Sequence, residues 1–419
     1  MSRKKIAIVG AGVSGLSAAF FLSNKNDVTL FELSQEVGGH AQTKQIQIND
    51  QKVNIDLGFV VYNYVNYKNF SKFLRHLNVS SQPTNMSFSF SKNLNNFEYA
   101  SMLPFGPFAQ PSNIFSAEFL IMLKDIIKFY IISKSLIRKG INSSMSLDSF
   151  LKEYNFSKSY CFNHLLPMAS SIWSLPISNV LQFQAKEFLK FYYEHGLLNF
   201  YNRPKWRIIS GGSREYIKKF LKFYKGKLNT NERVVGVVRS KNLVKINTIK
   251  NNYDFDHVIF ATHPRETIKI IKDLDSQETS FLEIFEQKVN QAYLHTDQSL
   301  MPLRKIAWSS WNYSDNSKNL DGMPSVTYWV NRLQQIKIDK NIFISLNPQT
   351  QPKEEFIIEK FKYNHPVFNV KIVDMLKKLS SIQGINNSWH CGAWTGYGFH
   401  EDGFSSGMKV ASSLGADIL

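Results

Sequence analysis

The chain has 419 residues, a hydrophobic fraction of 43% and a formal net charge of +17 at pH 7. This length exceeds that of an ordinary single-core domain, so two packed domains are expected, each with its own core. The excess of Lys and Arg favours an anionic partner, namely nucleic acid, anionic lipid or a phosphorylated ligand. Because the basic residues are scattered and no nucleic-acid-binding signature accompanies them, nucleic acid is not expected as a partner.

Cysteine usage and the N-terminus favour a cytoplasmic location. Cys161 and Cys391 are the only cysteines, too few for a disulfide framework or a cysteine-based metal site, and no metal is expected. The chain passes from residues 2–5 directly into a strand expected over 6–9, which leaves no room for a cleavable signal peptide. No uninterrupted apolar run reaches the length of a membrane span.

Residues 5–31 predict a βαβ unit: a strand, a glycine turn, a helix over 13–23 and a second strand. The turn has the GxGxxG pattern, whose glycines permit a tight turn, close approach of the backbone to a pyrophosphate, and close helix packing. The helix N-terminus then faces the negative charge of the ligand. Contacts with a dinucleotide are expected from Gly10, Gly12, Val13, Ser14 and Gly15.

Glu32 ends the second strand of this unit. A carboxylate at that position accepts hydrogen bonds from a ribose diol and disfavours a 2′-phosphate, which argues against NADP. The turn and the carboxylate together do not distinguish FAD from NAD.

The rest of the chain alternates between the two periodicities. A helix is expected to end near residue 75, followed by loops marked by four prolines between 83 and 111. Residues 112–205 carry long helical patterns, and a mixed stretch follows at about 266–385. Short strands are expected at 233–238, 243–248, 257–261 and 341–346.

Later motifs separate the two cofactors. Gly38-Gly39-His40 follows Glu32, and Asp56-Leu57-Gly58-Phe59 comes next. Further pieces are Trp206 to Ser213, Arg233-Val234-Val235, Val258 to Thr262, Gly392-Ala393-Trp394 and Glu401-Asp402-Gly403. Together these segments resemble the flavin-containing amine oxidase and phytoene desaturase superfamily, and the resemblance covers little of the helical insertion.

The resemblance implies non-covalent FAD and an α/β fold. Its Rossmann-type, GR2-like FAD-binding domain would comprise residues 1–80, 206–265 and 386–419, and a helix-rich substrate domain would be inserted as 81–205 and 266–385. Beyond the first turn and Glu32, the residues implied to contact FAD are Gly38, Gly39, His40, Gly58, Val235, Ala261, Thr262, Gly392, Asp402, Gly403 and Phe404.

Physical reasoning supports the C-terminal part of this assignment. A glycine turn at Gly403 followed by a helix over 405–414 would point a helix N-terminus at the flavin N1 and C2 carbonyl, where reduction leaves negative charge. Asp402 or Glu401 would bond the ribityl hydroxyls. The alternative is an ordinary glycine loop before a terminal helix.

Three positions depart from the superfamily pattern. His40 stands where an arginine usually contacts the pyrophosphate, so that contact would be weaker or made by main chain. His400 takes roughly the place of a tyrosine that cages amines, which puts a simple amine substrate in doubt. Cys391 does not sit in the position that binds flavin covalently, so dissociable FAD is expected.

A further set of segments resembles a bacterial subgroup of predicted NAD/FAD-binding oxidoreductases that accompany cyclopropane fatty acid synthases. These segments are His295-Thr296-Asp297, Met301-Pro302, Trp308 to Asn312 and Gly398 to Gly403. The implied function is FAD-dependent oxidoreduction of a small apolar substrate, fatty acyl or lipid-linked. An amine oxidase, a polyene desaturase or isomerase, and a non-catalytic FAD-binding scaffold for a lipid-modifying partner remain alternatives. Hydride transfer needs chiefly position beside the flavin N5, so no catalytic residue is assigned.

Two features allow more than one interpretation. His295 and Asp297 would share one face of a strand, as a general base with its orienting carboxylate or, as we favour, as a structural pair. Ile114–Ile137, placed on a helix, combines a narrow polar stripe with a wide apolar face. That helix would pack inside the substrate domain, or would contact an anionic membrane and place the protein at its inner face. The stripe is Lys124, Asp125, Lys128, Ser135 and Arg138; the apolar face holds Phe115, Phe119, Ile126, Phe129, Tyr130 and Ile137.

Overall fold

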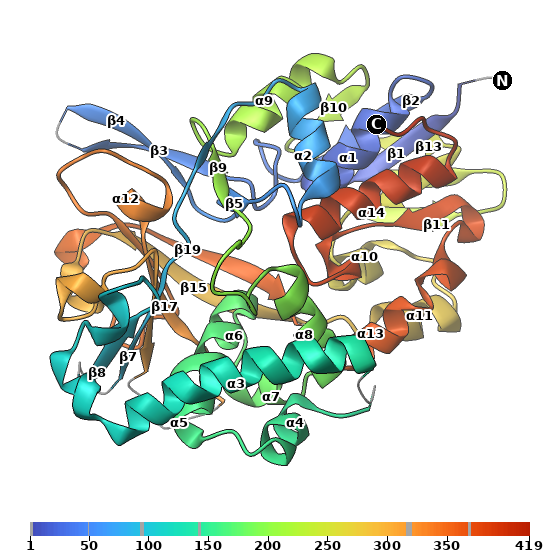
Figure 1. Ribbon diagram of the computed structural model, residues 1–419. Coiled ribbons are helices and arrows are strands. Elements are labelled where there is room, and N and C mark those ends of the chain that lie inside the picture. The colour runs from blue at the N-terminus through green and yellow to red at the C-terminus, as the bar shows by residue number, and fades with distance from the viewer. Residues whose placement is uncertain (1–2, 49, 93–95, 141–143, 316–320, 368–369) are drawn as a thin grey trace.

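The structure is a computed structural model that describes residues 3–48, 50–92, 96–140, 144–315, 321–367 and 370–419. A five-stranded parallel sheet with the order β10-β2-β1-β14-β20 carries the N-terminal βαβ unit (Figure 1). The three central strands β2, β1 and β14 are nearly continuous apolar runs, because both faces of the sheet are covered there. They span Lys5–Val9 (β1), Asp27–Phe31 (β2), Lys227–Asn229 (β10), His257–Phe260 (β14) and Ser388–His390 (β20).

Helices cover one face of this sheet and a small antiparallel sheet covers the other. The helical layer packs around one apolar cluster and consists of α1 (Val13–Leu22), α2 (Lys68–His76), α9 (Arg214–Phe223) and α14 (His400–Ser413). The opposite layer is β11 (Val234–Arg239), β12 (Val244–Thr248) and β13 (Asn252–Phe255). The parallel sheet thus draws its strands from widely separated parts of the chain, while the domain boundaries given above stay a prediction.

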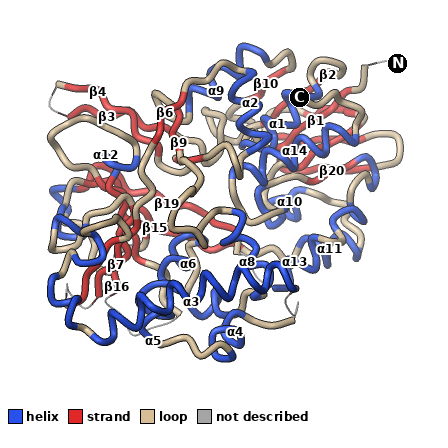
Figure 2. The backbone as a smooth tube through the Cα atoms, in the orientation of Figure 1, coloured by secondary structure: helices blue, strands red, loops and turns tan. Residues whose placement is uncertain are grey.

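A second, seven-stranded sheet has the order β19-β15-β18-β17-β16-β7-β8. It is antiparallel except where β16 pairs with β7. Figure 2 shows the strands in two separate groups, this sheet on the left and the parallel sheet at the upper right. Its strands span Phe88–Lys92 (β7), Phe97–Ala100 (β8), Gln287–His295 (β15), Trp311–Asp315 (β16), Ser325–Trp329 (β17), Phe343–Leu346 (β18) and Ile357–Pro366 (β19).

The expectation of proline-marked loops up to residue 111 is wrong for part of that segment. Residues 88–92 and 97–100 pair as an antiparallel hairpin whose strands complete the seven-stranded sheet. Phe90 and Tyr99 are buried in this hairpin, so burial of alternate aromatic side chains outweighs the polar residues between them.

Helices over 117–194 pack against this second sheet in one large apolar cluster. They are α3 (Ala117–Lys139), α4 (Leu147–Glu153), α5 (Lys158–Tyr160), α6 (Leu166–Trp173), α7 (Ile177–Leu181) and α8 (Ala185–Glu194). Within α3, Phe119 and Phe129 are fully buried. The face of α3 that carries these two residues therefore packs in the core against the second sheet, and the membrane interpretation is wrong for Phe119 and Phe129. None of the helices among the described residues is long and apolar enough to cross a membrane.

The remaining elements are short. Two small antiparallel sheets complete the strands: β3 (Thr43–Ile48) pairs with β4 (Gln51–Asp56), and β9 (Arg207–Ile209) lies between β5 (Val61–Tyr62) and β6 (Ser81–Pro83). The other helices are α10 (Pro264–Ile270), α11 (Ser276–Leu282), α12 (Val330–Leu333) and α13 (Val370–Leu376).

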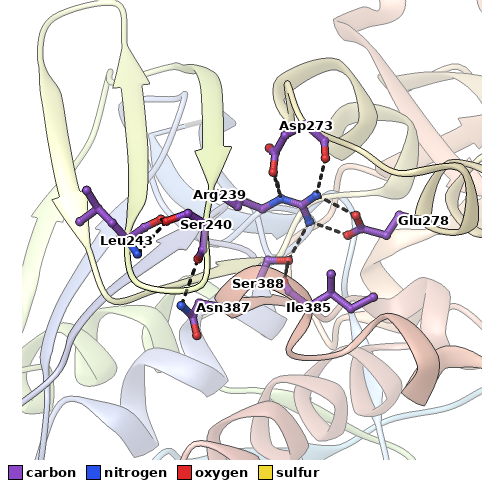
Figure 3. Close-up of polar contacts among 8 residues, drawn as sticks. All are labelled: Arg239, Ser240, Leu243, Asp273, Glu278, Ile385, Asn387 and Ser388. Atoms are coloured by element: carbon purple, nitrogen blue, oxygen red, sulfur yellow. Dashed lines mark hydrogen bonds and ion pairs between the residues drawn. The ribbon is translucent and has the colours of Figure 1, made fainter.

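A buried ion pair joins the small sheet to α11 (Figure 3). Arg239, at the end of β11, donates to Glu278 at 2.7 Å, and both side chains are fully buried. The same guanidinium donates to Asp273 and to the Ser388 hydroxyl on β20. One buried cation therefore connects three separate parts of the chain.

Candidate cofactor site

The residues proposed to bind the cofactor follow the carboxyl ends of the parallel strands. Gly10 comes after β1, Glu32 after β2, Ala261 after β14 and Gly392 two residues after β20. In open α/β sheets this edge is where ligands bind.

The first glycine turn is closely packed. A side chain at Gly15 would place its Cβ 1.9 Å from the Gly10 carbonyl oxygen, and Gly10 itself has φ +101°. Gly12 is the N-cap of α1 and offers no side-chain acceptor, so the first-turn N–H groups, including those of Val13 and Ser14, lack a side-chain cap. Such N–H groups suit a pyrophosphate.

Glu32 lies beside this turn. Its carboxylate accepts hydrogen bonds from the Ala11 N–H and the Ser34 N–H, both at 2.9 Å. A carboxylate has about four acceptor positions, so two such bonds leave capacity for ribose hydroxyls. The structure thereby holds the carboxylate next to the glycine turn.

The second glycine pair packs directly on the first turn. Gly38 donates to the Ala11 carbonyl at 2.8 Å, and a Cβ at Gly39 would lie 3.1 Å from the Gly12 Cα. Gly38 and Gly39 both have positive φ. The two turns form one glycine-lined surface.

Two later strands reach the same region. Ala261 donates to the Val9 carbonyl, and a Cβ at Gly10 would meet Ala261 and Thr262 at 3.0 and 3.1 Å. In β11 the pairing with β12 skips Val235, which is exposed at a bulge. The Glu232 N–H donates to the Glu32 carbonyl, which places the start of β11 beside the proposed ribose position.

The C-terminal helix differs from the expectation. It begins at His400, so Gly403 lies within its first turn and is not a turn before a helix over 405–414. The physical reason is helix packing: a Cβ at Gly403 would lie 2.7 Å from the Val13 side chain, and one at Gly407 would lie 2.1 Å from the Ser14 carbonyl oxygen. Figure 1 shows α14 lying beside α1.

Asp402, Glu401 and Phe404 make contacts that the sequence did not indicate. Asp402 accepts from the Phe399 N–H at 2.9 Å and so caps its own helix, while burial raises the pKa of this carboxyl to about 6. Glu401 accepts from Asn69 and Phe70 at the start of α2. The Phe404 side chain is buried in the apolar cluster of the helical layer, so only its backbone can face a cofactor. A ribityl role for Asp402 stays a prediction.

Gly58 and Gly392 also lie at this edge. A Cβ at Gly58 would lie 2.4 Å from the His40 carbonyl oxygen, which accepts from the Phe59 N–H. Gly392 donates to the Ser406 hydroxyl of α14 at 2.9 Å.

Sequence reasoning missed a wall of histidine and aromatic rings beside Gly58. The His40 ring stacks on Tyr363 at 5.2 Å, and Tyr363 stacks on His365, both from β19. Part of the His40 side chain is exposed to solvent. The surrounding protein nevertheless removes enough water from the ring to lower its pKa. The buried Tyr363 hydroxyl has no hydrogen-bond partner among the described residues. A cofactor carbonyl or ring nitrogen would satisfy this hydroxyl, so the residues present fit FAD.

His400 belongs to a second ring group next to this wall. It stacks on Phe59 at 3.7 Å, and its Nε2 lies 3.0 Å from the Tyr216 hydroxyl. Burial lowers the pKa of His400 to about 3 and that of His365 to about 4. Both imidazoles are therefore uncharged at neutral pH. The signal for this wall was the alternation of aromatic and histidine side chains at 361, 363 and 365, but their partner at 40 is too distant in sequence to infer.

His295 and Asp297 have a structural role. The Asp297 backbone N–H donates to His295 Nδ1 at 3.1 Å, and the imidazole Nε2 lies 2.8 Å from the Ser345 hydroxyl. The Asp297 carboxylate accepts from the Ser299 and Lys353 N–H groups. The carboxylate therefore does not orient the imidazole, and the full burial of His295 favours the structural interpretation over a general base.

The glycine turns at the carboxyl edge of the parallel sheet form a site that suits a dinucleotide. A family model described as flavin containing amine oxidoreductase matches residues 13–333. Because this match covers more than half of the chain, the protein belongs to that family.

Solved structures share the whole fold at low sequence identity. A fatty acid isomerase from P. acnes that produces CLA has a TM-score of 0.70 and 13% identity, with 99% of each chain covered. Cyclohexylamine oxidase from Brevibacterium oxydans IH-35A has a TM-score of 0.67 and 12% identity, and putrescine oxidase bound to putrescine 0.66 and 12%, each with 99% of both chains covered. No curated protein matches the sequence.

Proposed function

We propose that this oxidoreductase binds FAD non-covalently and acts on an apolar carbon chain, fatty acyl or lipid-linked. When bound, FAD supplies the redox chemistry by accepting a hydride equivalent from the substrate. The glycine turns and the α1 N-terminus would hold the pyrophosphate, Glu32 the ribose, and the Val235 backbone the adenine.

The observation that carries the substrate proposal is the uncharged, ring-lined wall beside Gly58. The neutral imidazoles of His365 and His400 stand among aromatic rings. The nearby carboxyls of Glu401 and Asp402 accept hydrogen bonds from backbone N–H groups. A wall of this kind attracts an apolar chain more than an ammonium group, which needs a carboxylate or an open aromatic face.

Non-covalent binding is supported by the state of the cysteines. Burial raises the pKa of the Cys391 thiol to about 12, and that of Cys161 to about 12 as well. Both thiols are protonated at neutral pH, and a thiol is a poor nucleophile compared with a thiolate. Cys391→Ser is therefore expected to leave the flavin bound and dissociable.

Two similarities to other proteins favour a lipid substrate. The fold is shared with a fatty acid isomerase, and several segments resemble oxidoreductases that accompany cyclopropane fatty acid synthases. An amine substrate is the second candidate, because cyclohexylamine and putrescine oxidases share the fold as well.

Anaerobic titration of the holoprotein tests the substrate class. Unsaturated fatty acids and phospholipids should bleach the flavin absorbance or be converted to products that mass spectrometry detects, and primary amines should do neither. Free FAD with the same lipids is the control. Flavin reduction by an amine, with no change in any lipid, would replace the lipid proposal by an amine oxidase.

A further inference from the structure

The outer face of α3 is apolar and cationic. Leu120, Ile121, Ile127 and Ile131 are all exposed there, Ile131 by 65%. Lys124, Lys134 and Arg138 fall on the same face, because residues 120, 124, 127, 131, 134 and 138 are separated by three or four positions. This outer face lies opposite Phe119 and Phe129, which are buried in the core.

The acidic side chains of α3 itself do not lie on this outer face. Of the acids in α3, all of whose residues are described, Glu118 lies in the first turn and accepts from Asn163, and Asp125 is buried and accepts from the Ser157 N–H. The exposed charges from residue 120 to residue 139 are therefore all positive.

The segment before α3 extends the apolar surface. Leu103, Phe105, Ile114 and Phe115 are exposed, Phe115 by 90%. A phenylalanine side chain exposed almost entirely to water does not stabilise the core. Exposed apolar groups that lie together typically mark an interaction surface.

A basic recess lies at the C-terminal end of the same helix. It has a volume of about 650 Å³, and its lining includes Lys134, Arg138, Arg203 and Lys205 against the single carboxyl residue Glu194. Tyr64 and Tyr193 supply exposed aromatic rings at its rim. A phosphate or another acidic head group suits four clustered cations.

From these observations we infer that the outer face of α3, with residues 103–115, docks on an anionic lipid bilayer. The apolar side chains enter the boundary between head groups and acyl chains, and the basic recess takes an anionic head group. Figure 1 shows α3 along the lower part of the molecule, far from the parallel sheet.

A second copy of the chain suits this face less well. A two-fold contact along α3 would bring the cations Lys124, Lys134 and Arg138 against the cations of the second copy, and like charges in a desolvated interface oppose association. An anionic membrane instead complements the same cations and the formal net charge of +17.

The docked face connects to the candidate site through α8. His195, next to the recess residues at the end of α8, stacks on Phe191 at 3.9 Å, and Phe191 stacks on Phe399 at 5.6 Å. Phe399 immediately precedes α14 and His400. This chain of packed rings joins the recess to the candidate site, and the docking inference does not depend on the substrate.

Co-sedimentation with vesicles tests the docking. The holoprotein should bind phosphatidylglycerol-containing vesicles at low salt, bind pure phosphatidylcholine vesicles much less, and dissociate in high salt. Ile127→Asp/Ile131→Asp and Lys134→Glu/Arg138→Glu should each weaken the partition coefficient about tenfold or more. Matched controls are Ile249→Asp/Val289→Asp and Lys222→Glu/Lys225→Glu, which alter exposed side chains elsewhere and should bind as the parent does.

Site-specific labelling tests which face is inserted. Because Cys161 and Cys391 are buried, an environment-sensitive fluorophore on Ile131→Cys is selective. Its emission should shift to the blue on anionic vesicles, whereas the same label on Ile249→Cys should not shift. Flavin content and circular dichroism verify that each variant is folded.

Three results would overturn the inference. One is absence of binding to anionic vesicles at low salt, and another is binding that neither shifts the label at position 131 nor responds to the α3 variants. The third is a stable dimer in sedimentation that Ile127→Asp/Ile131→Asp dissociates, which would assign the face to a second copy. None of these readouts depends on turnover, so they leave the proposed function untouched.

Discussion

At the residue scale, the cofactor site is defined largely by positions where a side chain cannot be placed. Gly15 has no room for a Cβ beside the Gly10 carbonyl, and Gly39 approaches the Gly12 Cα. These contacts leave backbone N–H groups to face the ligand. The charged side chain of Glu32 reaches this turn directly, because its carboxylate accepts a hydrogen bond from the Ala11 N–H.

Glu32→Ala should weaken FAD binding by about 1–3 kcal/mol, because bonds from ribose hydroxyls to a charged acceptor are lost. Fluorescence titration of the apoprotein with FAD measures the effect. Glu36→Ala, an exposed acid in the following loop, is the control and should bind FAD as the parent does. Equal dissociation constants for the Glu32 variant and the parent would remove the ribose role.

At the element scale, the site depends on how closely α14 packs on α1. Gly403 and Gly407 allow the approach, and the Ser17 hydroxyl on α1 donates to the Phe404 carbonyl at 2.7 Å. The two helices therefore fix each other's position at the edge where the cofactor is proposed to lie.

Gly407→Ala should lower the free energy of unfolding by roughly 1–3 kcal/mol, because its methyl group would meet the Ser14 carbonyl, which belongs to the α1 backbone. Ser412→Ala, at an exposed position of the same helix, should change stability by less than about 0.5 kcal/mol. Urea unfolding of both variants gives the comparison. A Gly407 variant as stable as the control would mean that the two helices can separate without cost.

Breaking the Arg239–Glu278 ion pair, which joins β11 to α11, is expected to lower the free energy of unfolding strongly. Glu278→Gln leaves a buried guanidinium without its fully buried partner, so a loss of about 3–5 kcal/mol is expected. Asp273→Asn should cost less, because Asp273 is partly exposed to solvent. If both substitutions cost the same in chemical denaturation, the buried pair is not what connects these elements.

At the scale of the whole molecule, buried histidines make stability depend on pH. Burial lowers the pKa to about 4 for His365 and to about 3 for His390 and His400. Burial also lowers the pKa of His164, His263 and His295 to about 4. Three carboxyls act in the opposite direction, because burial raises the pKa of Asp402 to about 6 and raises the pKa of Asp56 and of Glu401.

The free energy of unfolding should therefore fall as pH drops below about 6.5. In that range the unfolded chain takes up protons that the folded histidines do not, and each histidine contributes up to about 1.4 kcal/mol per pH unit until its folded pKa is reached. Denaturation between about pH 7 and pH 5 measures the slope. The double variant His365→Gln/His390→Gln should show a shallower slope, and an unchanged slope would contradict the assignment.

Local signals account for what the sequence could predict. The first βαβ unit was predictable, because glycine spacing, an apolar strand and a terminal acid all fall within residues 5–32. The pairing of residues 88–92 with 97–100 and the long strand β19 were missed. In β19, half-buried rings alternate with Lys360, Lys362 and Asn364, which is a strand pattern, but its pairing with β15 and its ring contact with His40 join residues too distant in sequence to infer. The start of α14 was predicted too late in the sequence, because a glycine such as Gly403 usually indicates a turn. The close contact with Val13 explains why a glycine is needed inside this helix, and that contact is visible only in the structure. The outward apolar face of α3 likewise could not be told from its buried face by periodicity alone.

The most direct test of the account is the flavin content of the purified protein. Denaturation should release close to one intact FAD per chain, and mass spectrometry should find no flavin attached to the polypeptide. A protein that purifies colourless and fails to take up added FAD would contradict the proposed cofactor site, and flavin that remains covalently bound would contradict the non-covalent assignment.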